Sequence, residues 1–580
     1  MTEVPEDVWR YTAQFIPKHI LRNLYEVNRA FFDMAMNERY REVSLFQFDN
    51  RMLYLLERLS CPSIGSRIRV LRLRPYFIQE LIYLQQRDLH GSTSIVSSLF
   101  SLFRNLSNLR EYHLQWNDLP LISKLSLDFL ILPFISSDNL RTLSLEMSLE
   151  KFQALFASLS ECMPLCELAL EDLTITLRHG GDGPANNVTD GALLASTLAP
   201  FIIQSQSNGT LRSFTFQSTH AQDSSHLFRA LSLSDVQDQP AMSNLQSLTL
   251  SIPTPSPQLG NPSALASFIS AHSETLTDLT LRGQWEHYFA LGLPGPSDMS
   301  FSPYIETCFS QVALPNLTSL TIATTSYSLT TSVRVVSRFV NSLKELDLTG
   351  RYTTFDDVEE LVRVFSLSSA EQARPLEVLQ IGPVTLSPEL VDLLAEGFPK
   401  LKELNMKIRD VVPNKDDTAI YHGIGRLVAG RKLRTQKQEQ IESFFQQMRT
   451  RVYRNWSLER ISVWKLNTRW QFQTQYATMF ARCVPSIRFP ESVAQRASAQ
   501  VAVSLASPLS MASSAVSSSS SASSSSSGSA ITSATTAATT SPLSSSGLGN
   551  VFTADVSTVC GWCQHGSGPF NGGSGPGCGC

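Results

Sequence analysis

The sequence of 580 residues lacks the features that mark membrane, secreted and nucleic-acid-binding proteins. No apolar run is long enough to span a bilayer, and the charged first residues do not form a secretory signal peptide. The formal net charge is only −4, which argues against a dedicated nucleic-acid binder. We therefore expect a cytoplasmic or nuclear chain, with no membrane and no nucleic acid among its partners.

Signatures of catalysis are missing as well. The sequence contains no Gly-x-Ser-x-Gly, no His-Glu-x-x-His, no phosphate-binding loop and no dinucleotide fingerprint. The few histidines, such as His113 and His220, have no evident catalytic partners. These absences predict a protein that is not an enzyme and that uses no cofactor.

Cysteine is sparse in the body of the chain. Nine cysteines occur in all, and five of them are scattered between residues 61 and 483. Because we expect a reducing compartment, we interpret these five as reduced structural residues. They are Cys61, Cys162, Cys166, Cys308 and Cys483.

The segment 491–580 has little charge and few large apolar residues, so it cannot offset its own ordering entropy. We expect a disordered low-complexity tail, rich in Ser, Ala and Thr and then in Gly and Cys. Its end has enough ligands for zinc, and it also resembles the doubly prenylated ends of Rab GTPases. A mis-predicted gene end would account for it too, and we assign no metal site. The residues concerned are Cys560, Cys563, His565, Cys578 and Cys580.

A six-residue phrase, Leu-x-x-Leu-x-Leu with small apolar substitutions, occurs twelve times. The steps between copies range from 25 to 57 residues, so the repeat is irregular. One such phrase would be noise, but twelve spread over most of the chain indicate a repeat architecture. The copies begin at Ile68, Leu109, Leu140, Leu165, Leu211, Leu245, Leu276, Leu317, Leu343, Leu376, Leu401 and Leu458.

Each phrase is typical of a strand with one buried side, because alternate side chains of a strand face opposite sides. In the copy at Leu343, Leu346 and Leu348 are expected to face a core and Glu345 and Asp347 to face outward. Helical segments separate the phrases; the clearest has Ser387 as its cap and continues to Gly397.

This alternation of strand, turn and helix resembles the leucine-rich repeat family. The resemblance implies an α/β fold, an irregular solenoid of parallel strands with outer helices over residues 60–490. One departure from the family is that the Asn following the strand is nearly absent; only Asn117 occupies that position. The backbone ladder that this Asn supports must therefore be satisfied in another way.

The first 45 residues have a different pattern, that of three short helices. Pro5 suits a first helical position, and Glu6 and Asp7 favour the positive end of the helix dipole. A segment of this size buries little surface alone, so it packs on the rest of the chain or on a partner.

Residues 1–45 resemble an F-box, in particular the variants that precede degenerate leucine-rich repeats in mushroom-forming fungi. The resemblance rests on Val4-Pro5-Glu6, on an aliphatic helix, and on Val27-Asn28-Arg29 followed by Phe31 and Phe32. Val4 and Asn28 depart from the Leu and Cys of the family. The resemblance implies a substrate-recognition subunit that docks on a Skp-type adaptor of a cullin ubiquitin ligase. The implied adaptor-binding residues are Val4, Pro5, Val8, Trp9, Phe15, Ile20, Leu21, Leu24, Val27 and Phe31.

Two alternatives remain open for these features. The short helices could form a structural cap on the first repeat of a non-ligase scaffold. The outward strand positions could be ordinary solvated Ser and Thr, or they could bind an unknown protein substrate. Our candidate residues for that substrate face are Thr215, Thr249, Thr280, Thr321, Glu345 and Asp347.

The longest interval between phrases, from Leu401 to Leu458, contains a basic cluster and then a segment expected to form an exposed helix over 436–454. Nuclear import or RNA contact would suit the cluster. Given the acidic total charge, we favour a solvated loop and helix face. The basic residues are Arg426, Arg431, Lys432, Arg434 and Lys437.

Overall fold

The computed structural model divides into two compact units, Met1–Ser507 and Pro508–Cys580, and the described residues all belong to the first. The predicted tail 491–580 with its cysteines, and Arg426 of the basic cluster, lie outside the described residues. Those residues are 4–47, 49–76, 92–117, 124–162, 168–178, 191–205, 209–218, 223–232, 242–253, 260–284, 301–322, 329–367, 376–417, 430–465 and 471–488.

In these ranges the first unit is built on one sheet of thirteen strands, whose spatial order is their sequence order. Every strand runs parallel to its neighbours, as in the pairing of Glu42 with Val70 and of Glu403 with Arg460. The strands are β1 Glu42–Leu45, β2 Val70–Leu73, β3 Glu111–Trp116, β4 Thr142–Met147, β5 Asp172–Leu177, β6 Ser213–Ser218, β7 Ser247–Pro253, β8 Asp278–Gln284, β9 Ser319–Ile322, β10 Glu345–Thr353, β11 Val378–Leu386, β12 Glu403–Val411 and β13 Arg460–Lys465.

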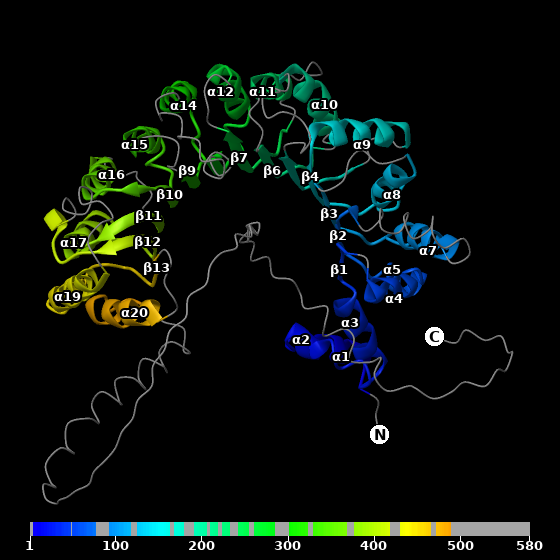
Figure 1. Ribbon diagram of the computed structural model, residues 1–580, viewed down its shortest axis with the longest axis horizontal. Coiled ribbons are helices and arrows are strands. Elements are labelled where there is room, and N and C mark those ends of the chain that lie inside the picture. The colour runs from blue at the N-terminus through cyan, green and yellow to red at the C-terminus, as the bar shows by residue number, and fades with distance from the viewer. Residues whose placement is uncertain are drawn as a thin grey trace, which may run out of the picture. The chain divides into compact units, whose positions relative to one another are not determined.

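Helices connect the strands and lie on one side of the sheet, so that the strands line the inner side of an arc (Figure 1). This arrangement is a leucine-rich-repeat-like α/β solenoid. The helices are α1 Glu6–Ala13, α2 Lys18–Leu21, α3 Arg29–Arg39, α4 Asn50–Leu59, α5 Pro62–Gly65, α7 Ser92–Arg104, α8 Lys124–Ile135, α9 Leu149–Cys162, α10 Gly191–Gln204, α11 Ser225–Ser232, α12 Pro262–Ala271, α14 Phe301–Ser310, α15 Leu329–Ser337, α16 Phe355–Leu367, α17 Pro388–Gly397, the 3-10 helix η3 Lys415–Asp417, α19 Gly430–Met448 and α20 Gln471–Cys483.

The expected alternation of buried and outward side chains is confirmed. Leu346 and Leu348 are each 1% exposed, whereas Glu345 is exposed and Asp347 is half-buried. One continuous apolar core runs from Tyr40 to Val484 between the sheet and the helices.

Eleven of the twelve phrases lead into strands at the expected place, and the copy at Leu165 is wrong. Strand β5 begins at Asp172, so the phrase in use is LEDLTI from Leu170. Strand β1 was not expected at all, and it lies within the range 1–45 that we predicted to be helical. Its phrase is YREVSL, in which Tyr40 replaces the first Leu and is buried.

Asparagines at another position, directly before the phrase, link neighbouring repeats in four places. In four repeats, the residue before the first Leu of the phrase is Asn, and its amide donates a hydrogen bond to a carbonyl of the preceding repeat. The carbonyls are at equivalent positions, two residues before that repeat's phrase. The pairs are Asn108–Ser66 (2.8 Å), Asn139–Ser107 (3.3 Å), Asn244–Gly209 (2.6 Å) and Asn316–Glu274 (2.8 Å).

Two helix predictions have different outcomes. Helix α17 follows the prediction: the Ser387 hydroxyl accepts a hydrogen bond from the Leu390 amide, and the helix ends at Gly397. The helix expected over 436–454 ends at Met448. Its apolar side is not exposed, because Phe444 and Met448 are fully buried in the core.

Candidate protein-interaction surfaces

The N-terminal segment has the local geometry that its capping residues dictate. Helix α1 begins directly after Pro5, and Arg10 pairs with Glu6 one turn away at 2.6 Å. Helix α3 begins after Asn28, whose side chain accepts a hydrogen bond from the Phe31 amide at 2.9 Å. The Asn that departs from the F-box pattern is therefore a good N-cap for this helix.

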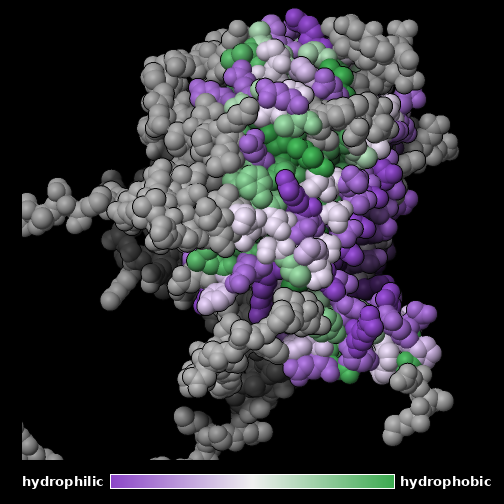
Figure 2. All heavy atoms as spheres, turned by 90° about the vertical axis from the view of Figure 1, so that its right-hand side faces the viewer, coloured by the Kyte–Doolittle hydropathy of each residue, from purple (hydrophilic) through white to green (hydrophobic). Residues whose placement is uncertain are grey.

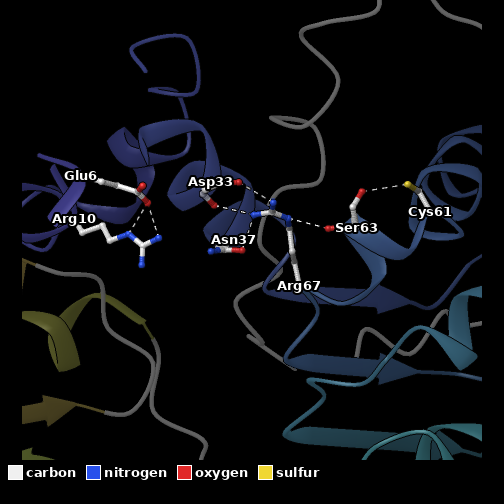
Figure 3. A network of polar contacts seen from close by, with 7 residues as sticks. All are labelled: Glu6, Arg10, Asp33, Asn37, Cys61, Ser63 and Arg67. Atoms are coloured by element: carbon white, nitrogen blue, oxygen red, sulfur yellow. Dashed lines mark hydrogen bonds and ion pairs between the residues drawn. The ribbon is translucent and has the colours of Figure 1, made fainter. Parts of the chain in front are cut away.

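Helix α3 is fastened to the first repeat by Arg67 (Figure 3). The Arg67 guanidinium contacts the Asp33 carboxylate at 2.9 Å and the Asn37 side chain at 2.7 Å, both on α3. It also donates to the backbone carbonyls of Asp33 and Ser63, and Ser63 belongs to α5. This network joins the N-terminal helices to the solenoid.

Exposed apolar side chains are concentrated in this segment. Fourteen large apolar residues are exposed among the described residues, and seven of them lie between Val4 and Phe32. On the side of the molecule where α3, α4 and α7 lie, hydrophobic side chains reach the surface in patches between hydrophilic ones (Figure 2). The seven are Val4, Val8, Tyr11, Phe15, Ile20, Val27 and Phe32.

Four of these residues form a stripe along α1 and its flanks. Val4, Val8, Tyr11 and Phe15 are spaced by four, three and four residues; Val8 and Tyr11 share one face of α1, and Val4 and Phe15 lie just beyond its two ends. The rings of Tyr11 and Phe15 meet edge to face at 5.1 Å. We call these four residues the apolar stripe. Tyr11 was absent from our predicted adaptor-binding residues, although its spacing was visible in the sequence.

The predicted adaptor-binding residues do not all reach the surface. Trp9, Leu21 and Leu24 are half-buried, and Phe31 is only 4% exposed because it packs between the helices, 5.7 Å from the Trp9 ring. The exposed members are Val4, Pro5, Val8, Phe15, Ile20 and Val27.

The candidate substrate residues lie side by side on the inner face of the sheet. Thr249 pairs in register with Thr215 on one side and Thr280 on the other, and Thr280 pairs with Thr321. Asp347 continues this row, and Glu345 lies in the adjacent row beside Ser319. The row also includes Thr174, next to Thr215, which we missed because the phrase for β5 was misplaced.

Charged side chains border this hydroxyl row on the first strands. Arg72 pairs with Glu42 at 2.8 Å, and Arg178 pairs with Glu146 at 2.8 Å. His113 follows Arg72 in the same row. Burial lowers the pKa of His113, the nearby Arg72 acts in the same direction, and Glu111 opposes both in part. The first strands of the inner face are thus charged, whereas the row from Thr174 to Thr321 consists of threonines only.

The sequence matches no protein-family model and no curated protein. Among solved structures, it is similar to the Rad7 and Elc1 complex in yeast, with 14% identity and a TM-score of 0.31 over 71% of this chain and 92% of that one. It is also similar to the leucine-rich repeat-containing protein LegL7 from Legionella pneumophila, with 13% identity and a TM-score of 0.29 over 57% of this chain and 100% of that one. The repeat assignment rests on the sheet order and the burial pattern given above.

Two further observations concern the described ranges only. None of their helices has the length and hydrophobicity needed to cross a bilayer. Nor do they bring together three or more His, Cys, Asp or Glu side chains in a group suited to a metal ion. Of the body cysteines within these ranges, Cys162, Cys308 and Cys483 are free thiols, and the Cys61 sulfur lies 3.2 Å from the Ser63 hydroxyl; Cys166 lies outside these ranges.

Proposed function

We propose that this protein is the substrate-recognition subunit of a Skp–cullin–F-box ubiquitin ligase. Its N-terminal helices would dock on a Skp-type adaptor, and the inner face of the solenoid would bind a protein substrate. In this role the protein performs no chemistry; it raises the rate of ubiquitin transfer by holding the substrate near the transferring subunits.

The observation that supports this proposal best is the apolar stripe. Fully burying one large aliphatic or aromatic side chain contributes about 1.5–3 kcal/mol. Since the side chains of the stripe are already partly covered, burying three of them on a partner would contribute about 2–5 kcal/mol. Exposed apolar clusters of this kind mark protein interaction sites.

The alternative, a structural cap on a non-ligase scaffold, is favoured by a different observation. Arg67 anchors α3, and Tyr40 and Met36 at the end of α3 join the core of the solenoid. However, none of the side chains of α1 and α2 belongs to that core cluster. A cap accounts for α3, and it leaves the stripe on α1 without a role.

The test replaces Val8 and Phe15 by Asp in the full chain and measures capture of a purified Skp-type adaptor. Two charges on the stripe would have to be buried on binding, which is costly. We expect affinity to fall by at least about tenfold, and circular dichroism to be unchanged because both positions are exposed.

The control is Leu367→Asp, which places one such charge on an exposed apolar residue of α16. It should retain wild-type adaptor binding. Equal capture of the stripe variant and the control would contradict the proposed function and leave the scaffold alternative.

A further inference from the structure

A row of arginines follows the edge of the sheet where the strands begin. The residue directly before the strand is arginine in five of the first six repeats. The Arg69 amide donates to the Arg41 carbonyl at 2.9 Å, and the Arg110 amide donates to the Arg69 carbonyl at 2.8 Å. Neighbouring parallel strands are about 4.8 Å apart, so like charges follow one another closely. We call Arg41, Arg69, Arg110 and Arg141 the basic edge.

The two ends of the basic edge are partly neutralised. Arg141 pairs with Glu171 at 2.6 Å. Arg41 lies 3.8 Å from Glu38, but this carboxylate is shared by further cations. These are Lys18 at 3.9 Å and Arg22 at 4.0 Å.

The centre of the basic edge has no such compensation. Arg69 and Arg110 are exposed, and among the described residues neither has an ion pair within 4.0 Å. The nearest carboxylates do not compensate these two arginines. Glu42 follows Arg41 in the sequence and Glu111 follows Arg110, and both face the inner surface of the sheet instead. Glu42 contacts Arg72 (2.8 Å), and Glu111 contacts His113 (3.7 Å).

The other half of the same edge is organised differently, which makes the arginine row stand out. On the last four strands, the equivalent positions alternate in sign: Lys344, Glu377, Lys402 and Glu459. Lys402 and Glu377 are 2.8 Å apart, and this contact lowers the pKa of Glu377. The fold therefore tolerates a self-complementary edge, and the uncompensated arginines are not required by the repeat.

We propose that the basic edge binds an acidic segment of a partner protein, a run of Asp and Glu in extended conformation. Each planar guanidinium forms paired hydrogen bonds with one carboxylate, which is the geometry that arginine favours over lysine. Arg69 and Arg110 supply the central contacts, and Arg41 and Arg141 supply the flanking ones. This site is separate from the apolar stripe, so it does not depend on adaptor binding.

A peptide fits this edge better than a nucleic acid does. The positive strip is only one side chain wide, because the next row of the inner face contains carboxylates. Those carboxylates would repel the phosphates of a broad polyanion, whereas a single extended chain need not cross them. Glu42 and Glu111 border the strip directly, and Asp172 follows them on β5.

The test uses the full chain and a fluorescein-labelled deca-glutamate peptide, with fluorescence anisotropy at low ionic strength. Arg110→Glu makes the edge alternate in sign from Arg69 to Glu171, like its other half. We expect this variant to bind the peptide at least roughly tenfold more weakly, while its melting temperature equals or exceeds that of the wild type.

The matched control is Lys344→Glu, which changes the net charge equally but places two carboxylates beside each other at Glu377. It should melt at a lower temperature than the wild type and bind the peptide normally. Failure of the wild type to bind, or equal weakening in both variants, would overturn the proposal. A nucleic-acid result would also overturn it. If deca-thymidylate bound the wild type at least as tightly as the peptide did, and bound Arg110→Glu more weakly, the site would be one for nucleic acid.

Discussion

Acid should destabilise this solenoid through one buried histidine, His272, which is 2% exposed at the end of α12. Its ring packs edge to face on Phe268 at 5.1 Å, and neither ring nitrogen makes a hydrogen bond of normal geometry to the described residues. Burial lowers the pKa of His272 from 6.5 to about 4, and the Met242 backbone opposes this shift only in part. The perturbation is a change of pH from 7 to 5, applied to the wild type and to His272→Leu.

The sign of the effect follows from where the proton binds. Between the two pKa values the unfolded chain takes up a proton on His272 and the native protein does not, so stability falls as the pH falls. The stabilisation is complete above the unfolded pKa of 6.5 and is lost on approaching the folded pKa of about 4. For these two values the loss between pH 7 and pH 5 is about 2 kcal/mol, and it approaches roughly 3 kcal/mol in stronger acid.

The assay is urea denaturation at both pH values, followed by circular dichroism. Carboxylates with ordinary pKa values titrate mainly below this window, and His113 is common to both proteins. The difference in the pH response between wild type and variant therefore isolates His272. An equal loss of unfolding free energy in the two proteins between pH 7 and pH 5 would refute the argument.

Two more predictions concern the sheet and the attachment of its first helices. The double variant Thr249→Arg, Thr280→Arg should melt like the wild type. The double variant Leu248→Arg, Leu279→Arg should unfold the repeat, because both leucines are at most 1% exposed and each arginine would bury an unpaired charge. Thermal melting decides, and similar melting of the two pairs would show that the inside and outside positions are assigned incorrectly. Arg67→Met should weaken the attachment of α3 by about 2 kcal/mol and therefore speed chymotrypsin cleavage before residue 41. Arg10→Met removes only an exposed ion pair and should leave the cleavage rate unchanged. Equal cleavage rates in the two variants would contradict that role for Arg67.

The repeat could be recognised from the sequence because burial imposes a strict pattern on a few positions. The first, fourth and sixth residues of each phrase enter the core, so the chemistry at those positions is restricted to apolar side chains. The pattern failed where the first residue was not Leu, as with Tyr40 before β1. It also failed where two leucine phrases overlapped, as with Leu165 and Leu170 before β5.

The cross-strand contacts were harder to predict, since they depend on pairs of residues some 30 to 45 positions apart. The asparagine that donates to the preceding repeat had a signal, the Asn-Leu pair that opens the phrase at Leu109 and Leu140. Its acceptors are backbone carbonyls, and no residue type in the sequence indicates which carbonyl will accept. Likewise, Phe31 and Phe32 are neighbours of the same type, and only the packing of α3 against Trp9 shows which of the two is buried.

The candidate binding surfaces follow from this division between constrained and free positions. The second, third and fifth residues of a phrase contribute nothing to the core, so each repeat is free to vary them independently. Parallel pairing then places equivalent positions of successive repeats about 4.8 Å apart, so a row forms across the sheet from residues scattered along the chain. A row of threonines suits strand propensity as well as binding, whereas a row of arginines is not required by the register, which the leucines hold. The basic edge shows this best: the same edge alternates in sign over its last four strands, whereas Arg69 and Arg110 have no ion pair among the described residues, with the same backbone ladder beneath both.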